Sequence, residues 1–369
     1  VVFSDNAKYD LESAGEYTQG AGGGALLIRH NPRLISIPDR WGVSTSPVHD
    51  FFKPRREVSI KSVISHVVQL ARETGASIKE GMVDRMVRHL PESTVRRMGI
   101  FSHGVDRVQV HRDEPVFDGQ FSNQCYQDAV EEAFRDFRSK AITDGRWDPD
   151  GETVLTEDWA RIIMHLPYAF QAKRMFPAVF AYERRGSASW ADVETEIGLP
   201  PSIDDFDDTP EGQAEHAKAM DGYRRSISKT QAYRDFHADR IEKGQRASSL
   251  IGNQYTGSIF LAMMSTFESD YEADSPLDGR QFGLCGYGSG AKAKVFEGIV
   301  SDRWREVVAS WNLFERMAGR MAIDQVTYEL LHKGIHEGSV LKPRGEFALV
   351  EIEGGEGELE GARTYAWVE

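Results

Sequence analysis

The chain has 369 residues, 40% hydrophobic and 28% charged, a composition typical of a globular protein with one or two domains. Its net charge of −14 argues against nucleic acid or an anionic membrane as partner, and no apolar run approaches the ~20 residues that span a bilayer. The two cysteines, Cys125 and Cys285, have neither CxxC nor zinc-site spacing, which argues against a disulfide framework and favours a reducing cytoplasm.

The first residues alternate short apolar runs with a glycine-rich segment. Residues 1–3 predict a buried strand already under way at the start of the chain, so we expect that a preceding segment is missing. Residues 13–24 predict a glycine-rich loop, because small residues let backbone approach backbone or ligand closely. Residues 25–28 predict a short buried strand, and residues 34–37 predict another.

Residues 55–114 differ from their surroundings. They contain eleven Lys/Arg against eight Asp/Glu, although the chain as a whole is acidic. Apolar spacing predicts amphipathic helices over 60–73 and 78–90, and residues 108–110 alternate like a strand. We therefore interpret 55–114 as an insertion with its own small core.

The next segments alternate helices and strands. A helix is expected from Ser122, its predicted N-cap, through Tyr126 and Phe134. Residues 156–164 predict a helix leading into a buried strand, and a long polar helix is expected over about 211–243.

The last third continues this alternation. Residues 252–266 predict a loop that leads into a buried helix, and residues 282–290 predict a strand that enters a glycine turn. Residues 347–352 and 364–368 predict a hairpin. Because strands and helices alternate, the predicted fold class is α/β.

Four segments combine a turn with polar side chains that could carry chemistry. They are Asp5 and Tyr9 with the turn 18–22, residues 49–54, residues 165–168, and the pair 252–258 and 286–290. Taken singly, each has an ordinary structural explanation. His165 could be a core histidine, Asn253 could hold an Asx turn, and Asp50 could cap a turn.

Taken together, the motifs resemble those of a known family. TQGAG, DFFKP, F-D-G-x-x-S-x-Q-C-Y, H-x-P-Y, GNxYTGS and YGSG follow one another from Thr18 to Gly290. This order resembles that of hydroxymethylglutaryl-CoA synthases, members of the thiolase-like superfamily. The resemblance implies a layered αβαβα sandwich with an incomplete N-terminal half. It assigns 1–54 to the remainder of that half, 55–114 to a helical insertion, and 115–369 to the C-terminal half with its hairpin.

The resemblance also implies the reaction. In this family a cysteine accepts the acetyl group of acetyl-CoA, a base removes a methyl proton, and the carbanion attacks the ketone of acetoacetyl-CoA. Nucleophile, base and oxyanion donors are therefore needed. The implied setting is the mevalonate pathway for isoprenoid precursors, in a cytoplasmic homodimer with no cofactor besides the coenzyme A thioesters.

Roles for individual residues follow from the motif matches. His165 matches the family histidine that contacts the acetoacetyl group, and an imidazole there can polarise the ketone. The implied catalytic residues are His165, Asp5, Asp50 and Tyr9, and the implied substrate-binding residues are Thr18, Asn253, Tyr255, Ser289 and Lys173. Phe170 departs from the family pattern, which has lysine there, so the contacts that hold CoA are less well defined.

Neither cysteine has the sequence setting of a nucleophile. Cys125 falls within a predicted amphipathic helix and Cys285 within a buried strand, so both are interpreted as small buried hydrophobes. The family's nucleophilic cysteine and general-base glutamate lie upstream of the first residue here. We therefore expect this chain to be inactive alone.

Two alternatives stay open at this stage. A ketoacyl or branching synthase that uses carrier-protein substrates would share the condensing chemistry. A non-catalytic acyl-CoA-binding subunit that pairs with a separate N-terminal polypeptide would share the pocket but not the reaction.

Overall fold

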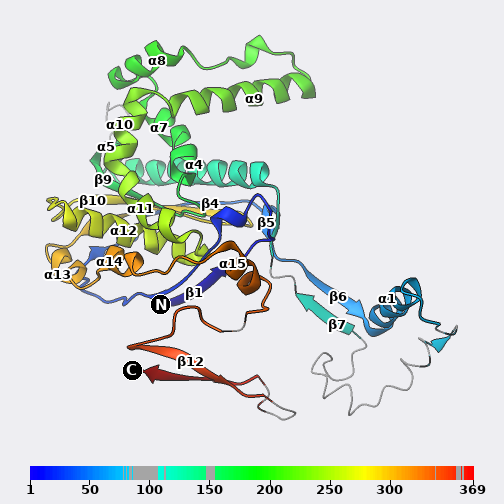
Figure 1. Ribbon diagram of the computed structural model, residues 1–369. Helices are drawn as coiled ribbons and strands as arrows, with labels where there is room; N and C mark the ends of the chain where they lie inside the picture. Colours follow the sequence, from blue (N-terminus) through cyan, green and yellow to red (C-terminus); the bar gives the residue numbers. More distant parts are fainter. Residues whose placement is uncertain are drawn as a thin grey trace. The chain divides into compact units, whose positions relative to one another are not determined.

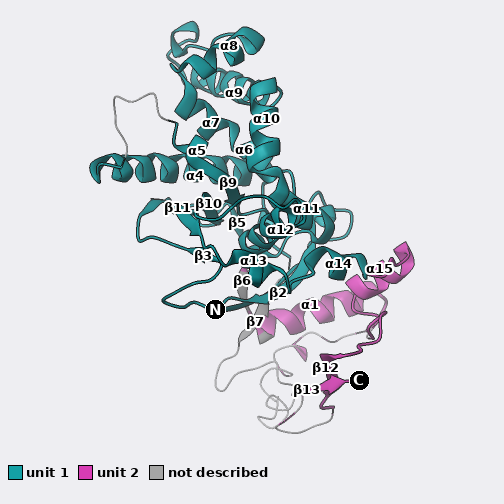
Figure 2. Cartoon of the chain, turned by 90° about the vertical axis from the view of Figure 1, so that its left-hand side faces the viewer, with its two compact units in different colours: residues 1–52, 114–319 teal, residues 53–113, 320–369 magenta. Residues whose placement is uncertain are grey.

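A computed structural model describes residues 1–77, 79, 81–82, 85, 107–111, 114–146, 154–336, 338–354, 359 and 361–369 (Figure 1). They fall into two compact units, residues 1–52 with 114–319 and residues 53–113 with 320–369 (Figure 2). All the candidate site residues belong to the first unit. The grouping of 320–369 with the interrupting segment differs from the sequence interpretation, which joined 115–369 into one half.

A five-stranded mixed sheet forms the centre of the first unit. β11 lies in its middle and pairs antiparallel with β10, β3 and β4, while β10 pairs parallel with β9. The strands are β3 (Ile35–Ser36), β4 (Trp41–Thr45), β9 (Trp159–Met164), β10 (Gln281–Gly288) and β11 (Lys292–Val300).

β9 shows why this sheet is internal. All six of its residues, Trp-Ala-Arg-Ile-Ile-Met, are buried, as expected for a strand in a parallel pair that is covered on both faces. Its one charged residue, Arg161, forms hydrogen bonds with the buried carboxylate of Asp270 at 2.8 and 2.6 Å. The prediction of a helix followed by a buried strand before His165 is confirmed by α5 (Leu155–Asp158) and β9.

Helices cover both faces of the sheet (Figure 1). α4 (Gly119–Thr143) packs on β4 and β11, and α12 (Ser258–Glu272) packs with α11 on the β9 side. The N-cap of α4 is Asp118, whose carboxylate accepts hydrogen bonds from the N–H groups of Gln120 and Phe121. The prediction of Ser122 as N-cap is wrong, because the charged Asp118 satisfies these first N–H groups and suits the helix dipole.

Gly42 of β4 lets the strand lie directly against α4. A Cβ added there would come within 2.0 Å of the Ala133 carbonyl oxygen and 2.5 Å of the Phe137 Cβ. Gly42→Ala is therefore expected to lower the free energy of unfolding by about 3 kcal/mol, measured by urea denaturation. Gly222→Ala is a matched control, because only the Arg225 side chain lies near its added Cβ, at 4.0 Å. An unchanged midpoint for Gly42→Ala would contradict this packing.

The predicted glycine-rich loop over 13–24 is confirmed only for residues 13–19, which form turns and a short 3-10 helix, Glu16–Thr18. The glycines that follow form a strand. β2 (Gly20–Ala25) pairs antiparallel with β1 (Val2–Ala7), and Asp5 lies opposite Gly22. Its glycines leave room for neighbouring groups, since a Cβ on Gly20 would meet the Asn253 carbonyl oxygen at 2.5 Å. The extended backbone was missed because glycine disfavours strands unless close packing demands it.

The strand predicted at the chain start is present, but its predicted burial is wrong, and the buried strand predicted over 25–28 is absent. Val1 and Val2 are 68% and 79% exposed, although Val2 does belong to β1. Leu27 and Ile28 are 85% and 77% exposed and lie outside any strand. Hydrophobicity alone predicted burial here, but no described element covers these side chains.

The predicted polar helix over 211–243 is divided into separate helices. α9 (Pro210–Ile227) ends before Thr230, whose hydroxyl caps α10 (Gln231–Arg240), and α11 (Glu242–Ile251) follows. The capping threonine and the break at Ile241 outweighed the continuous polar pattern. The other helices of this unit are α6 (Gln171–Met175), α7 (Pro177–Arg184), α8 (Ala191–Ile197), α13 (Trp304–Val308) and α14 (Leu313–Ala318). A two-stranded pair joins β5 (Phe51–Phe52) to β8 (Val116–Phe117).

The second unit contains short elements. α1 (Ile60–Glu73) confirms the first predicted amphipathic helix, and most of the predicted helix over 78–90 lies outside the described residues. The predicted C-terminal hairpin is confirmed by β12 (Glu346–Ile352) and β13 (Arg363–Val368). The remaining elements are β6 (Arg55–Ser59), β7 (Arg107–His111) and α15 (Gln325–His332). In neither unit does a described helix have the length and apolar character needed to cross a bilayer.

Candidate active site

His165 directly follows β9, and its backbone is fixed from two sides. Its N–H donates to the Cys285 carbonyl of β10 at 2.9 Å, and its carbonyl accepts from the Tyr126 hydroxyl of α4 at 2.8 Å. The Tyr126 ring stacks against the imidazole, with centroids 6.4 Å apart. Within the described residues the ring nitrogens make no hydrogen bond, so they can serve a ligand.

The surroundings of His165 keep its imidazole neutral. Burial lowers its pKa from 6.5 to about 4, although the side chain keeps a small exposed part. A neutral imidazole carries one N–H donor and one acceptor nitrogen at physiological pH. His165 can therefore donate a hydrogen bond to a carbonyl oxygen without carrying a positive charge.

This shift predicts a pH dependence of stability. The unfolded chain takes up a proton at the ordinary histidine pKa of 6.5, before the folded chain does at about 4. The contribution from a neutral imidazole is thus complete above pH 6.5 and is lost as the pH falls towards 4. Relative to His165→Gln, the wild type should lose ~2 kcal/mol of unfolding free energy between pH 7 and pH 4.5. A pH-independent difference between the two proteins in urea denaturation would contradict this.

Asp50 anchors the YGSG turn. It is fully buried, and its carboxylate accepts the Tyr287 hydroxyl at 2.6 Å and the Gly290 N–H at 2.8 Å. Burial and the neighbouring Asp50 raise the pKa of Tyr287, while a hydrogen bond with the Ser289 side chain opposes the rise. Tyr287 in turn packs on Tyr126, with ring centroids 4.6 Å apart. Asp50 is thereby connected to His165 through two tyrosine rings.

Asn253 organises the GNxYTGS loop. Its side-chain oxygen accepts from the Tyr255 N–H at 2.8 Å and from the Ser258 hydroxyl at 3.2 Å, and its amide nitrogen donates to the Tyr9 hydroxyl at 3.3 Å. The first of these bonds forms an Asx turn that supports the positive φ of 42° at Tyr255. Because the amide nitrogen carries two hydrogens, the second remains for a ligand.

The Tyr9 hydroxyl is the meeting point of three segments. Its pKa is raised by burial, and this rise is opposed by hydrogen bonds with the side chains of Asn253, Thr18 and Tyr255. The Thr18 carbonyl also accepts the Asn253 N–H at 2.9 Å. The pKa of Tyr255 is likewise raised, mainly by burial and further by Tyr9 and Asp5. One carboxylate oxygen of Asp5 is buried and makes no hydrogen bond within the described residues.

Phe51 links the residues around Tyr9 and Asn253 to Asp50 and so to the residues around His165. Its ring lies 6.5 Å from that of Tyr9 and 5.9 Å from that of Tyr255, and it directly follows Asp50. The structure therefore brings Asp5, Tyr9, Thr18, Asp50, His165, Asn253, Tyr255 and Ser289 into one network of neighbouring contacts within the first unit.

Lys173 is not part of this network. It is exposed on α6, and no described contact links its ammonium group to His165 or Asn253. The neighbouring Arg174, in contrast, contacts the H-x-P-Y motif, because its guanidinium donates to the Tyr168 hydroxyl at 3.0 Å.

Sequence reasoning missed two residues of the network, Tyr126 and Phe51. Tyr126 was interpreted only as an apolar helix residue, and Phe51 was treated as part of a motif without a role. Their positions inside the QCY and DFFKP motifs were the signal that could have indicated them.

Both cysteine thiols are held in the protonated form. Burial raises the pKa of Cys285 to about 12, and burial together with Asp50 and Asp128 raises that of Cys125. Neither therefore has surroundings that would form a thiolate at neutral pH.

The layered mixed sheet and the turns beside His165 define an α/β protein of the thiolase-like class. MvaS in complex with 3-hydroxy-3-methylglutaryl coenzyme A is similar in structure, with a TM-score of 0.65 and 25% identity, over 100% of this chain and 66% of that one. The curacin-pathway HMG synthase in complex with an acetyl donor-ACP, with a TM-score of 0.60 and 16% identity, shares the fold.

The chain belongs to the hydroxymethylglutaryl-CoA synthase family. The family model for the hydroxymethylglutaryl-coenzyme A synthase C terminal matches residues 108–336, more than half of the chain. The hydroxymethylglutaryl-CoA synthase of Haloferax volcanii is 26% identical over 375 residues, 100% of this chain and 67% of that protein. The Saccharomyces cerevisiae synthase is 23% identical over 63% of this chain and 45% of its own length. The chain thus spans between about half and two thirds of these relatives.

Proposed function

We propose that the chain binds acetoacetyl-CoA and carries the acceptor side of the hydroxymethylglutaryl-CoA synthase reaction. In that reaction acetyl-CoA, acetoacetyl-CoA and water give 3-hydroxy-3-methylglutaryl-CoA and CoA. The observation that carries the proposal is the placement of a neutral His165 imidazole beside the Tyr126–Tyr287–Asp50 contacts. Family membership supports the choice of reaction.

The acceptor ketone gains negative charge as the carbanion attacks it. A hydrogen bond from the neutral imidazole to the ketone oxygen is stronger in that state than before attack, which is the requirement for catalysis. His165 then supplies a proton to the tertiary alkoxide and recovers one from solvent. The second N–H of Asn253 and the hydroxyl or backbone N–H of Ser289 are further donors for substrate oxygens.

Asp50 and Tyr9 act as positioning residues in this proposal. Asp50 holds the Gly290 N–H and the Tyr287 hydroxyl, and Tyr9 holds the Asn253 amide. Tyr255 forms a side-chain hydrogen bond with Tyr9, and Asp5 contributes to the electrostatic surroundings of Tyr255. The donors are thereby arranged before substrate arrives, which lowers the reorganisation needed in the transition state.

Free coenzyme A thioesters are the proposed substrates. The solved relative with 25% identity is described in complex with an HMG-CoA ligand, whereas the carrier-protein complexes share 16% identity and support the fold alone. A cytoplasmic homodimer in the mevalonate pathway, with no other cofactor, completes the proposal through the family resemblance.

Thermal unfolding with increasing acetoacetyl-CoA tests the proposal. A ligand that binds only the folded chain at one hundred times its Kd adds about 2.7 kcal/mol, so the Tm should rise by roughly 5 °C or more. Asn253→Asp is the matched variant, because its carboxylate keeps the acceptors of the Asx turn and loses the amide donor. The rise in Tm should be smaller for this variant than for the wild type. If the Tm of the wild type did not change at millimolar acetoacetyl-CoA, the proposed binding would be refuted.

A further inference from the structure

Gly286 lies directly beside His165 in the central sheet. β9 and β10 are parallel with Met164 opposite Cys285, so the next pair along the register is His165 and Gly286. The hydrogen bond from the His165 N–H to the Cys285 carbonyl, at 2.9 Å, continues the ladder to this pair. Residues that lie opposite one another in a sheet direct their side chains to the same face. A side chain at position 286 would therefore lie next to the imidazole.

Both residues belong to the face of the sheet that α12 covers, while α4 covers the other face (Figure 1). On β10, Phe282 packs on Phe267 of α12 with ring centroids 5.1 Å apart, and alternate residues lead from there to Gly286. On β9, Arg161 donates to a carboxylate of α12 at 2.8 Å, and alternate residues lead to His165. Because α12 begins at the end of the GNxYTGS motif, this face also carries the candidate site.

Gly286 leaves room beside the imidazole. A Cβ added there would lie 3.8 Å from the Ile259 Cδ1 and 3.9 Å from the Lys294 carbonyl oxygen, which are ordinary van der Waals distances. On the same strand, a Cβ added to Gly283 would come within 2.1 Å of the Trp159 ring. Packing therefore requires glycine at 283 and does not require it at 286.

The free space continues along the strand and has an apolar border. At Gly288, two residues further along the same face, the surroundings of an added Cβ are open to beyond 4 Å. At Gly286 the nearest atom belongs to the aliphatic side chain of Ile259, the first residue after the GNxYTGS motif. A border of this kind favours a hydrocarbon group as its occupant.

We propose that Gly286 sets the size of the acceptor, so that the chain takes 3-oxoacyl-CoA thioesters one carbon longer than acetoacetyl-CoA as well as acetoacetyl-CoA itself. The proposal rests on the proposed function, because that function places the acceptor ketone at His165. The terminal alkyl group on that ketone is then a neighbour of Gly286 and Ile259. An ethyl group in place of the methyl group occupies the room that a side chain at position 286 would fill. The added carbon takes no part in bond making, so the balance of the reaction is unchanged.

Isothermal titration of the 369-residue chain with acetoacetyl-CoA and 3-oxopentanoyl-CoA tests the proposal. The wild type is expected to bind the two thioesters within about tenfold of each other, because the ethyl group enters free space. In Gly286→Ala the added methyl group takes that space. The ratio of the two affinities should therefore shift by about tenfold or more against 3-oxopentanoyl-CoA, as is usual for one methylene in a site of fixed size.

Gly319→Ala is the matched control. Gly319 follows α14, its φ of −74° suits alanine, and its added Cβ would lie 3.4 Å from the nearest atom, the Arg316 carbonyl oxygen. The ratio of the two affinities in this variant should equal that of the wild type. An equal shift in Gly286→Ala and Gly319→Ala would overturn the proposal, since the effect would then not depend on the place of the methyl group.

Urea denaturation of the same proteins tests whether the room exists. Alanine suits an extended backbone better than glycine, so Gly286→Ala should unfold at the wild-type midpoint or above it. Gly283→Ala should unfold at a lower denaturant concentration, because its methyl group meets the Trp159 ring. A loss of stability in Gly286→Ala as large as that in Gly283→Ala would show that the space is filled and would overturn the proposal.

The titrations also separate this proposal from the proposed function. A wild type that binds acetoacetyl-CoA but binds 3-oxopentanoyl-CoA more than tenfold more weakly overturns only the proposal for Gly286. An unchanged affinity ratio in Gly286→Ala has the same meaning. A wild type that binds neither thioester overturns the proposed function and, with it, the role of Gly286.

Discussion

Replacing His165 with alanine is expected to slow hydroxymethylglutaryl-CoA formation by roughly two to four orders of magnitude. The ketone oxygen would lose the one donor that sits on a fixed backbone at the end of β9. That backbone is held by hydrogen bonds from Tyr126 and to Cys285, neither of which involves the imidazole. The loss should therefore fall on kcat and not on folding. The rate is measured as hydroxymethylglutaryl-CoA formed from acetyl-CoA and acetoacetyl-CoA, in a preparation whose wild-type form catalyses the reaction.

His165→Asn serves as the comparison for this variant. Its amide retains an N–H donor but has no nitrogen that can take up and release a proton near neutral pH. We expect a rate between those of the wild type and the alanine variant. Condensation at the wild-type rate by His165→Ala, with an unchanged Tm, would show that the histidine has been assigned wrongly.

Asp50→Ala is expected to lower the free energy of unfolding by about 2–5 kcal/mol. The substitution leaves the Tyr287 hydroxyl and the Gly290 N–H without their acceptor in a region where Asp50 itself is fully buried. A buried donor without a partner costs more than the hydrogen bond contributed when it was present. Urea denaturation of the 369-residue chain measures the change.

Asp50→Asn and Tyr287→Phe separate the contributions of these two hydrogen bonds to the free energy of unfolding. Asparagine keeps one acceptor oxygen for the Gly290 N–H, and phenylalanine removes only the tyrosine hydroxyl, so each should cost about 1–2 kcal/mol. Because the two sites share one hydrogen bond, the double variant should cost less than the sum of the two. Additive effects, or an Asp50→Ala protein as stable as the wild type, would contradict the proposed anchoring of the YGSG turn.

Local patterns predicted much of the fold. The continuous apolar run of β9 indicated a covered strand, amphipathic spacing indicated α1, and alternating residues indicated the hairpin of β12 and β13. Each of these signals acts over a few neighbouring residues, where periodicity is a direct consequence of helix or strand geometry.

The errors arose where distant contacts decide the local structure. Gly20–Ala25 forms a strand because the loop around Asn253 needs space beside it, which no local pattern expresses. The breaks around Thr230 and Ile241 divide a polar segment that periodicity treated as continuous. Exposure of Leu27 and Ile28 could not be inferred from hydrophobicity.

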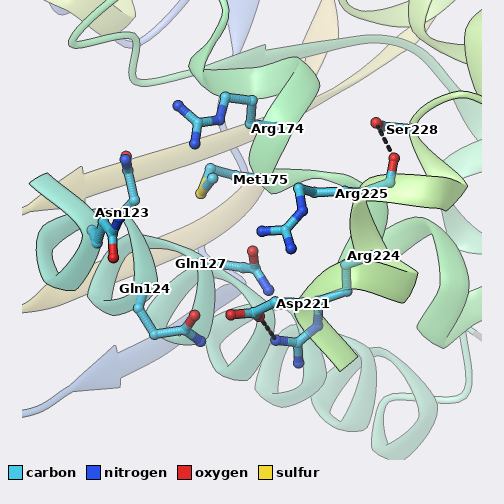
Figure 3. A pocket seen from close by; sticks show the side chains of 10 residues that line it. Asn123, Gln124, Gln127, Arg174, Met175, Asp221, Arg224, Arg225 and Ser228 are labelled. Carbon is cyan, nitrogen blue, oxygen red and sulfur yellow. Dashed lines mark hydrogen bonds and ion pairs between the residues drawn. The ribbon is translucent and has the colours of Figure 1, made fainter. Parts of the chain in front are cut away.

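The candidate site was likewise predictable only in part. The motifs supplied the residue types, but the Tyr9–Asn253 and Asp50–Tyr287 hydrogen bonds join residues 244 and 237 positions apart. The Asx turn, offered as the ordinary explanation for Asn253, is present and occupies its side-chain oxygen. Positive charge was expected at Lys173, whereas Arg174 of α6 and Arg224 and Arg225 of α9 line one polar cavity (Figure 3), and α9 contains no motif that the sequence analysis recognised.

The most direct test of the acceptor-side assignment is a calorimetric comparison of acetoacetyl-CoA with CoA on this chain. The acetoacetyl carbonyls should add hydrogen bonds from His165 and Asn253, so acetoacetyl-CoA should bind about tenfold more tightly than CoA. His165→Ala and Asn253→Asp should each reduce that preference while CoA affinity stays the same. Equal affinity for the two ligands, or a preference that survives both substitutions, would contradict the assignment.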